Sequence, residues 1–387
     1  MDKTVFRQLL DLVSQRSFRR IASGNEESHG NQKLTAWEQF ICMSFAQLTN
    51  RQGLRDIEIC LRGLEPKLYH IGLHSRVSRS TLARANNKRP SKIFLGFAQH
   101  LIKEARELYR DEKFDNELNE IVYVIDSTYI SLCLALFPWA RIGSQNIAGL
   151  KLHAQLDLRG SIPSFIDVSK GSYPDNKMLD NIVIEPGAFY VLDKAYIDFK
   201  RLNKIDEDKG FFVARFKQNI AFSRISSNVV DQAKGVLLDQ VGKFSGSVGK
   251  KNYQSKIRKV VFHERDSNKT LTFMTNNFSV QADVVAKLYK YRWRIEIFFK
   301  WVKQNLRIEK FYGTSLNAEE TQIWIAISTY LLVAIAKKKL KLTQPLAQIL
   351  HILSVSLFEK ELLSELLSNK HYLDSQLHST NQLNLFT

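Results

Sequence analysis

The chain has 387 residues, 44% of them hydrophobic, which is enough for two or three domains with cores of their own. Lys and Arg together number 56 against 39 Asp and Glu, so the formal net charge is +17. This excess of cations runs along the whole chain and favours an extended contact with a polyanion, most simply nucleic acid. A basic protein that is merely soluble is the alternative.

We expect neither export nor a membrane segment. The first residues are amphipathic and lack the apolar core of a signal peptide. The longest apolar run, Ile323–Ala336, is too short to span a bilayer comfortably, so it predicts a buried helix. The cysteines Cys42, Cys60 and Cys133 have no CxxC spacing, which argues against a zinc ribbon or a disulfide framework and suits a reducing compartment.

Residues 1–118 carry helical periodicity with few strand signals, which predicts a helical N-terminal domain. Within it, the segment SRVSRSTLARANNKR predicts a basic helix capped by Ser78 or Ser80. The side chains expected on its exposed face are Arg79, Arg84, Asn86, Asn87, Lys88 and Arg89. A short helix followed by a capped basic helix is typical of helix-turn-helix geometry, so we predict DNA contacts from Arg79, Arg84 and Lys88. A solvated basic helix is the alternative.

The period changes to that of strands from Glu120 onwards. Apolar or alternating runs predict strands at 121–126, 150–158, 162–169, 187–193 and 210–216. The second and third form a hairpin, and helices at 175–183 and 196–205 separate the later strands. This order predicts an α/β fold with a mixed sheet covered by helices. Residues 217–277 predict a β-rich insertion, with short strands at 236–241, 257–262 and 271–275 between turns rich in Gly, Ser and Lys.

The segment from Tyr289 to Lys303 predicts one helix with a polar stripe beside an apolar one. Tyr289, Arg292, Glu296 and Lys303 fall within an arc of roughly 60° on a helical wheel. Such a helix can hold Glu296 at the edge of a core while its cations reach for an anion. An amphipathic helix with i,i+4 ion pairs on its solvated side is the alternative.

Three carboxylates in this part of the chain point to metal chemistry. Asp126 and Asp193 each end a predicted strand, and sites in such sheets gather at the carboxyl ends of strands. With Glu296 they would offer hard oxygen ligands suited to Mg²⁺ or Mn²⁺ rather than zinc. Two such ions about 4 Å apart can activate a water or a 3′-hydroxyl and stabilise the leaving oxygen of a phosphodiester. A strand-end turn residue is the ordinary role of either aspartate alone.

The spacing Tyr289-x2-Arg292-x3-Glu296-x6-Lys303 resembles the YREK signature of DDE transposases from bacterial insertion sequences, family four. The blocks VYVIDSTYISLCLALFPWA, YVLDKAYIDF and RIEKFYGTS are similar to that family's two aspartate regions and to the tract after its YREK helix. The opening block LTAWEQFICMSFAQLTNRQGLRDIEICL is similar to its N-terminal domain. The resemblance runs from residue 1 to about 340.

The resemblance implies an RNase H-like catalytic domain at 119–340 with a β-rich insertion at about 217–277, after the helical domain 1–118 and before a helical tail at 341–387. It implies catalytic and metal-ligating Asp126, Asp193 and Glu296, two Mg²⁺ or Mn²⁺ ions, and contacts from Tyr289, Arg292 and Lys303 to DNA phosphates. The implied reaction is cleavage at the terminal inverted repeats and joining of the 3′-hydroxyls to target DNA.

Because two ends must be brought together, we expect a dimer on double-stranded DNA, in the cytoplasm and associated with the bacterial nucleoid. Two alternatives stay open: a decayed copy that only binds DNA, and an RNase H-like nuclease that does not join strands. The family usually has Asp-Arg-Gly-Tyr where this chain has Asp193-Lys194-Ala195-Tyr196. If that turn needs a positive φ, Ala195 costs stability where glycine would not.

Overall fold

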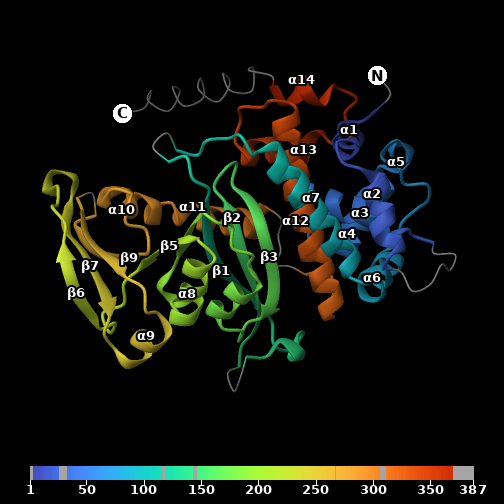
Figure 1. Cartoon of the computed structure of the whole chain (residues 1–387). Helices are drawn as coiled ribbons and strands as arrows, with labels where there is room; N and C mark the ends of the chain where they lie inside the picture. Colours follow the sequence, from blue (N-terminus) through green and yellow to red (C-terminus); the bar gives the residue numbers. More distant parts are fainter. Residues whose placement is uncertain are drawn as a thin grey trace, which may run out of the picture. The chain divides into compact units, whose positions relative to one another are not determined.

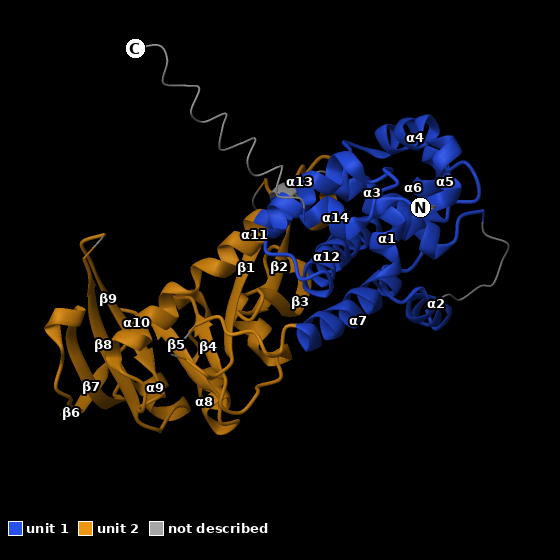
Figure 2. Cartoon of the chain, turned by 90° about the horizontal axis from the view of Figure 1, so that it is seen from above, with its two compact units in different colours: residues 1–108, 301–387 blue, residues 109–300 orange. Residues whose placement is uncertain are grey.

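The computed structural model describes residues 3–25, 33–115, 118–142, 146–265, 267–305 and 311–368. Figure 2 colours the two compact units of the chain, one of residues 1–108 and 301–387, the other of residues 109–300. This division differs from the expected domains because the chain returns to the helical unit at Trp301, well before residue 341. The helix Leu316–Lys339 therefore packs against the N-terminal helices.

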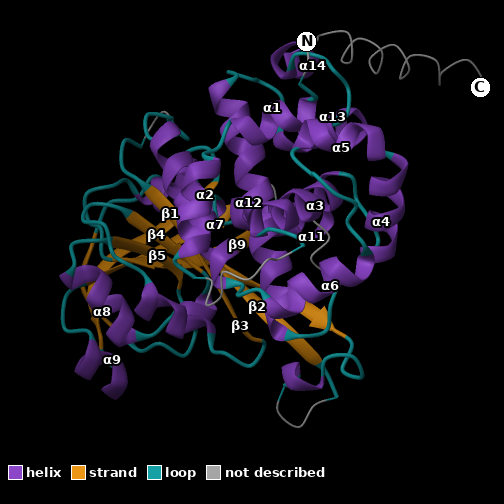
Figure 3. Cartoon of the chain, turned by 90° about the vertical axis from the view of Figure 1, so that its right-hand side faces the viewer, coloured by secondary structure: helices purple, strands orange, loops and turns teal. Residues whose placement is uncertain are grey.

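The first unit is built from helices, drawn in purple in Figure 3, and its described residues include no strand. Its helices are α1 (Val5–Asp11), α2 (Gln15–Ser23), α3 (Ala36–Leu48), α4 (Leu54–Gly63), α5 (Glu65–Ile71), α6 (Arg79–Lys88), α7 (Lys92–Leu108), α12 (Leu316–Lys339), α13 (Leu346–Ser356) and α14 (Leu363–Ser368). Ser78 caps α6 by accepting from the backbone N–H of Thr81, as one of the two predicted caps.

The centre of this unit is α12, which packs against α7 and α3. Its residues are buried from Thr321 to Ala336 without a break, so the run Ile323–Ala336 forms the buried helix that the sequence predicts. In the described ranges, no helix combines the length and apolar character needed to cross a membrane. An apolar helix of this kind must be covered on every side by other helices.

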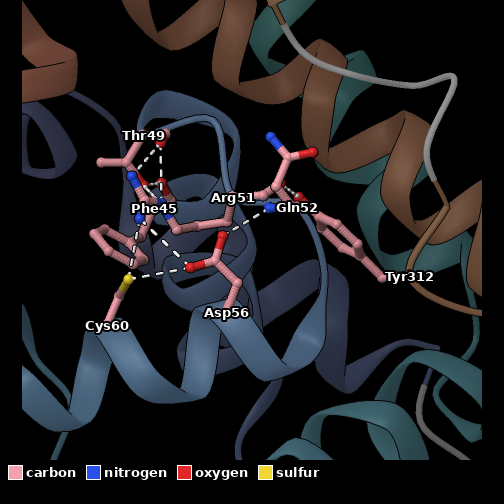
Figure 4. A network of polar contacts seen from close by, with 7 residues as sticks. All are labelled: Phe45, Thr49, Arg51, Gln52, Asp56, Cys60 and Tyr312. Carbon is pink, nitrogen blue, oxygen red and sulfur yellow. Dashed lines mark hydrogen bonds and ion pairs between the residues drawn. The ribbon is translucent and has the colours of Figure 1, made fainter.

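The turn between α3 and α4 is fixed by Arg51, as Figure 4 shows. Its guanidinium donates to the carbonyl of Thr49 at the end of α3 and pairs with Asp56 on α4. Asp56 in turn accepts from the backbone N–H of Gln52, 2.8 Å away, which holds the pKa of this carboxyl below its usual value. Tyr312 donates its hydroxyl to the Arg51 carbonyl. Arg51 thus binds a backbone carbonyl at the end of α3, and Asp56 binds a backbone N–H just before α4, so both helix ends are satisfied.

The second unit is organised by one mixed sheet in the order β3-β2-β1-β4-β5-β9-β8-β7-β6 (Figure 1). The strands are β1 (Val122–Leu132), β2 (Ala148–Asp157), β3 (Ile162–Lys170), β4 (Phe189–Leu192), β5 (Phe211–Arg215), β6 (Phe222–Ser227), β7 (Val236–Phe244), β8 (Ile257–Glu264) and β9 (Lys269–Thr275). β1, β4 and β5 are parallel, whereas β2 and β3 form the predicted antiparallel hairpin beside β1.

Helices cover this sheet and complete the fold. They are α8 (Phe199–Glu207), α9 (Ser247–Asn252), α10 (Ala282–Lys290) and the start of α11 (Trp293–Asn305), with 3₁₀ turns η1 (Pro138–Ala140), η2 (Asp175–Asn181), η3 (Lys194–Tyr196) and η4 (Gln232–Lys234). One face buries a core that includes Tyr123, Ile125, Met178, Tyr190 and Leu202. The predicted fold class is confirmed: an RNase H-like mixed sheet flanked by helices, with the insertion adding β6–β9 to the same sheet.

Three local predictions were wrong. The strand expected to end at Asp126 continues to Leu132, because the hairpin partner β2 pairs with it as far as Ala148. β6 was missed because its sequence, FSRISS, lies at the exposed edge and lacks a buried alternating face. The helix expected from Tyr289 to Lys303 is two helices, α10 and α11, with a break at residues 291–292.

Candidate active site

Asp126 lies where β1 stops pairing with β4 but continues to pair with β2. The parallel pairing of β1 with β4 ends at Ile125 opposite Leu192, and Asp126 is the next residue. Its partner on the other side is Ala154 of β2. The Asp126 carboxylate accepts from the backbone N–H of Ser127 through Oδ1, at 2.8 Å, and from Arg292 through Oδ2, at 2.9 Å. Each oxygen therefore has a different donor.

Asp193 occupies the corresponding position after β4, directly following Leu192. Because Ile125 and Leu192 are paired, Asp126 within β1 and Asp193 after β4 lie at the same level of the sheet. Tyr289 donates its hydroxyl to Asp193 Oδ1 at 3.1 Å. Tyr289 is itself buried and lies against Phe273 of β9, so the phenol comes to Asp193 from the core rather than from solvent.

Arg292 joins the first and third carboxylates. One terminal nitrogen lies 2.9 Å from Asp126 Oδ2 and the other 2.6 Å from Glu296 Oε1. Arg292 is 21% exposed in its side chain, against 18% for Asp126 and 35% for Glu296. The guanidinium fork thus places one delocalised positive charge between two carboxylates that would otherwise repel each other.

The break between α10 and α11 gives Arg292 this position. Tyr291 hydrogen-bonds to Asp115, and Lys287 pairs with the same carboxylate at 3.0 Å. Phe114 packs edge-on against the Tyr291 ring. The chain preceding β1 therefore clamps the break, a role for Asp115 and Tyr291 that the sequence reasoning missed. A single helix would instead have left Tyr289, Arg292 and Glu296 in one stripe, as predicted.

The electrostatics of Asp126 suit the binding of a further cation. The pKa of Asp126 is raised to about 6, chiefly by burial; Asp193 and Glu296 add to this rise, and the Ser127 N–H and Arg292 oppose it. Three carboxylates with one arginine leave an excess of negative charge on hard oxygen atoms, which fits Mg²⁺ or Mn²⁺. Across the described ranges, however, no three His, Cys, Asp or Glu side chains lie close enough together to hold one ion. The carboxylates are gathered around arginine and tyrosine instead.

A cleft of about 510 Å³ adjoins this cluster. Tyr289 and Arg292 line it, together with Trp293 and insertion residues that include Phe262 and Phe273. Trp293 is 62% exposed at this cleft. Trp301, the other tryptophan of α11, packs edge-on against Tyr330 of α12.

The remaining predicted DNA contacts lie in the helical unit. Lys303 is in the last turn of α11, partly buried and two turns beyond Glu296. On α6, Arg79, Arg84 and Lys88 are exposed as predicted, but Asn86 and Arg89 are 1% and 6% exposed. They are buried because Asn86 accepts from Gln39 of α3 and Arg89 donates to the Leu34 carbonyl.

The turn after Asp193 contains no strained alanine. Lys194–Tyr196 forms the 3₁₀ turn η3, and Ala195 is absent from the residues with positive φ. Both Lys194 and Ala195 are exposed. The stability cost considered for Ala195 therefore does not arise, because a 3₁₀ turn uses right-handed φ values that any L-residue adopts.

Known proteins resemble this chain along most of its length. The family model "Transposase DDE domain" matches residues 117–332, and "Domain of unknown function (DUF4372)" matches residues 1–74. The putative transposase y4zB of Sinorhizobium fredii (strain NBRC 101917 / NGR234) is 31% identical over 282 residues, covering 72% of this chain and 77% of that one.

A probable transposase for insertion sequence element IS5377 of Geobacillus stearothermophilus is 29% identical over 266 residues, or 67% of each chain. A cryo-EM structure of the piggyBac transposase synaptic complex with hairpin DNA aligns with a TM-score of 0.45 and 12% identity, over 97% of this chain and 83% of that chain. Since the DDE model covers more than half of the residues, the chain belongs to the DDE transposases of insertion sequences, enzymes of DNA transposition.

Proposed function

We propose that this DDE transposase binds the terminal inverted repeats of its element, cleaves the phosphodiester bonds at the ends and joins the 3′-hydroxyls to target DNA. The observation that carries the proposal is the bridge from Asp126 through Arg292 to Glu296, at the level where Asp193 follows β4. Acids from separate elements are gathered there around a cation, in a chain with a net charge of +17.

Asp126, Asp193 and Glu296 would hold two Mg²⁺ ions, or Mn²⁺ in their place. Bound there, these ions supply the positive charge that activates an attacking oxygen and stabilises the leaving oxygen of a phosphodiester. Arg292 now neutralises two of the three carboxylates, so a metal ion and the guanidinium compete for Asp126 Oδ2 and Glu296 Oε1. Once displaced, Arg292 is available to bind a DNA phosphate in bidentate fashion.

Tyr289 and the remaining basic residues would bind DNA phosphates on either side of the reacting bond. Tyr289 and Lys303 are proposed to contact phosphates near the cut, and Arg79, Arg84 and Lys88 to contact the inverted repeat from α6. Exposed Trp293, at the rim of the cleft, offers a flat apolar surface on which an unpaired base could stack. Two ends must be held together for joining, so we propose a dimer in the synaptic complex, acting in the cytoplasm at the nucleoid.

The deciding experiment is metal-dependent cleavage of a duplex that carries the element's inverted repeat, with the wild type beside Asp126→Ala. We expect cleavage at the repeat boundary in Mg²⁺ and none in the variant. Binding without cleavage by both proteins, at every Mg²⁺ and Mn²⁺ concentration, would identify a decayed enzyme that only binds DNA.

A second assay separates joining from hydrolysis. Pre-nicked ends with a free 3′-hydroxyl are incubated with target plasmid, and joined products are scored. A transposase gives joined molecules that disappear in Glu296→Gln, whereas an RNase H-like nuclease gives only shortened strands. The two assays together test the reaction class and the assigned residues independently.

A further inference from the structure

A second polar group lies behind Asp126, on the opposite face of the sheet. Successive side chains of a strand point to opposite faces, so Ser127 of β1 faces the side of Tyr123 and Ile125 rather than that of Asp126. The Ser127 hydroxyl donates to Asp175 Oδ1 at 2.6 Å. Asp175 begins η2, which packs against η3, the turn that follows Asp193.

Asp175 is held in place from the neighbouring strand β2. Lys151 Nζ lies 3.1 Å from Asp175 Oδ1 and donates to the Tyr173 carbonyl at 2.9 Å. His153, fully buried and opposite Ser127 in the register, has Nδ1 4.0 Å from the same Oδ1. Its Nε2 lies 2.8 Å from the Ser169 hydroxyl on β3. The Asp175 carboxylate is thus fixed by a cation and two strands.

Burial keeps the imidazole of His153 neutral. The pKa of His153 is lowered to about 4, chiefly by desolvation; Asp175 opposes this shift and Lys151 adds to it. Lys151 is therefore the group that compensates the charge of Asp175 at neutral pH. A charge-compensated carboxylate in a fixed orientation is a strong hydrogen-bond acceptor for a neighbouring hydroxyl.

The hydrogen bond between Ser127 and Asp175 lies at the point where β1 loses β4 as a neighbouring strand. Pairing with β4 stops at Ile125, so from Asp126 onwards β1 is paired only with β2. The Ser127 N–H on this stretch binds Asp126 Oδ1, and this contact sets the direction of the carboxylate. Any rotation of the Asp126–Ser127 peptide would turn Asp126 Oδ2 away from the place where it now meets Arg292.

We propose that Asp175 is a positioning residue for Asp126: by holding the Ser127 hydroxyl it fixes the peptide whose N–H binds Asp126 Oδ1, and so presents Oδ2 to the metal ion. This role rests on the proposed function, in which Asp126 is a metal ligand. Partners one step removed from a metal ligand commonly change its affinity by about 10–100-fold when they are lost.

The other role open to Asp175 is structural, as the partner of Lys151 that ties η2 to the hairpin. A structural role would alter the melting temperature but would leave the metal affinity of the folded protein unchanged. A field effect of the Asp175 charge would alter the affinity whether or not the hydrogen bond survives. The three roles therefore predict different patterns across a small set of variants.

The experiment measures Mn²⁺ binding to the full-length protein without DNA, by electron paramagnetic resonance of the free ion, with melting temperatures recorded in parallel. The variants are Asp175→Ala, Asp175→Asn, Ser127→Ala, Ser127→Thr and the double alanine variant. Asp180→Asn is the matched control. Asp180 also lies on η2 and also pairs with a cation, but that cation is Arg201 of α8 rather than a residue of the hairpin. This control tests the loss of an ion pair from η2 that does not reach Ser127.

We expect Asp175→Ala and Ser127→Ala each to weaken Mn²⁺ binding about tenfold. The double variant should bind Mn²⁺ no more weakly than either single variant, because both changes remove the same hydrogen bond between Ser127 and Asp175. Asp175→Asn and Ser127→Thr should retain most of the affinity, since each keeps the hydrogen bond, and Asp180→Asn should equal the wild type.

Unchanged affinity in Ser127→Ala, additive losses, or an Asp175→Asn variant as weak as Asp175→Ala would each overturn the positioning role while leaving the proposed function intact. Should the wild type itself take up no Mn²⁺, the metal-ligand assignment fails and the positioning role fails with it. Asp175→Asn preserves the shape of the side chain, so the result does not depend on whether the alanine variant folds.

Discussion

Two glutamates, one in each unit, differ in their exposure to water and in their charged partners. Glu296 of the sheet unit is 35% exposed and binds Arg292 at 2.6 Å. Glu319, on α12 of the helical unit, is fully buried, and neither of its oxygens has a hydrogen-bond partner in the part of the chain that the structure describes. Burial, with a smaller effect of Glu320, raises the pKa of Glu319 to about 8.

The difference teaches which carboxylate can serve as a metal ligand. Glu296 keeps contact with water and is neutralised by a cation that another cation can replace. Glu319 has lost its water and has no counter-charge among the described residues, so at neutral pH it is largely protonated. The exchangeable charge of Glu296 therefore suits its proposed role as a metal ligand, whereas the buried Glu319 is a cost to stability at high pH.

The largest effect is expected from Glu296→Gln. The change keeps the shape of the side chain and its contact with Arg292 but removes the charge that would hold a metal ion. Losing several kcal/mol of transition-state stabilisation should lower the rate of end cleavage on the order of 10³-fold. Gel-shift measurements with the inverted repeat should show nearly unchanged binding. A variant that cleaves normally, or that no longer binds the repeat, would mean that Glu296 is misassigned.

The complementary change, Glu319→Gln, should act on stability and not on chemistry. Because the pKa of folded Glu319 lies above its unfolded value, its contribution to stability is complete below about pH 4.5 and is lost as pH rises through about 8. The wild type should therefore lose on the order of a few kcal/mol between pH 5 and pH 9 that the glutamine variant does not lose.

Urea unfolding at the two pH values measures this difference. Glu104→Gln is the matched control, because Glu104 of the same unit is paired with Lys339 at 2.7 Å. The control should keep the pH dependence of the wild type. Parallel curves for the wild type and Glu319→Gln would show that Glu319 ionises normally, which would remove the contrast with Glu296.

A smaller effect is expected from the exposed cations of α6. Replacing Arg84 and Lys88 together by alanine should weaken binding of the inverted repeat and reduce the slope of log affinity against log salt by about 1.8, the value for two phosphate contacts. Replacing Arg20 and Lys103, exposed cations on α2 and α7, supplies a control with the same loss of charge. Equal slopes in both double variants would indicate a general charge effect rather than contacts from α6.

The smallest effect is expected from Ala195→Gly, which restores the residue usual in the family. Since η3 has no positive φ at this position, glycine only adds freedom to the unfolded chain and should destabilise the protein by about 0.4–1 kcal/mol. Urea unfolding measures the change, with Ala233→Gly in the 3₁₀ turn η4 as the comparison. A gain in stability would reveal strain at Ala195.

Much of the sheet unit could be predicted from the chain because its signals are local. Apolar runs of β-branched residues gave β1, β4 and β5, and alternation with a Gly-containing turn gave the β2–β3 hairpin. The spacing of Tyr289, Arg292, Glu296 and Lys303 marked the right segment. The same spacing wrongly predicted one continuous helix there. The helix is broken next to Tyr291, which is held by Asp115, a residue 176 positions away in sequence.

The sequence by itself determined the fold class, the family and the segments that carry the three carboxylates, since periodicity and residue spacing are properties of neighbouring residues. Only the tertiary structure decided which charges meet: that Arg292 lies between Asp126 and Glu296, that Asp175 reaches Ser127 from the other face of the sheet, and that Asn86, Arg89 and Glu319 are buried. The physical reason is that burial and counter-charge come from elements distant in sequence, so the environment of an ionisable group exists only once those elements have packed.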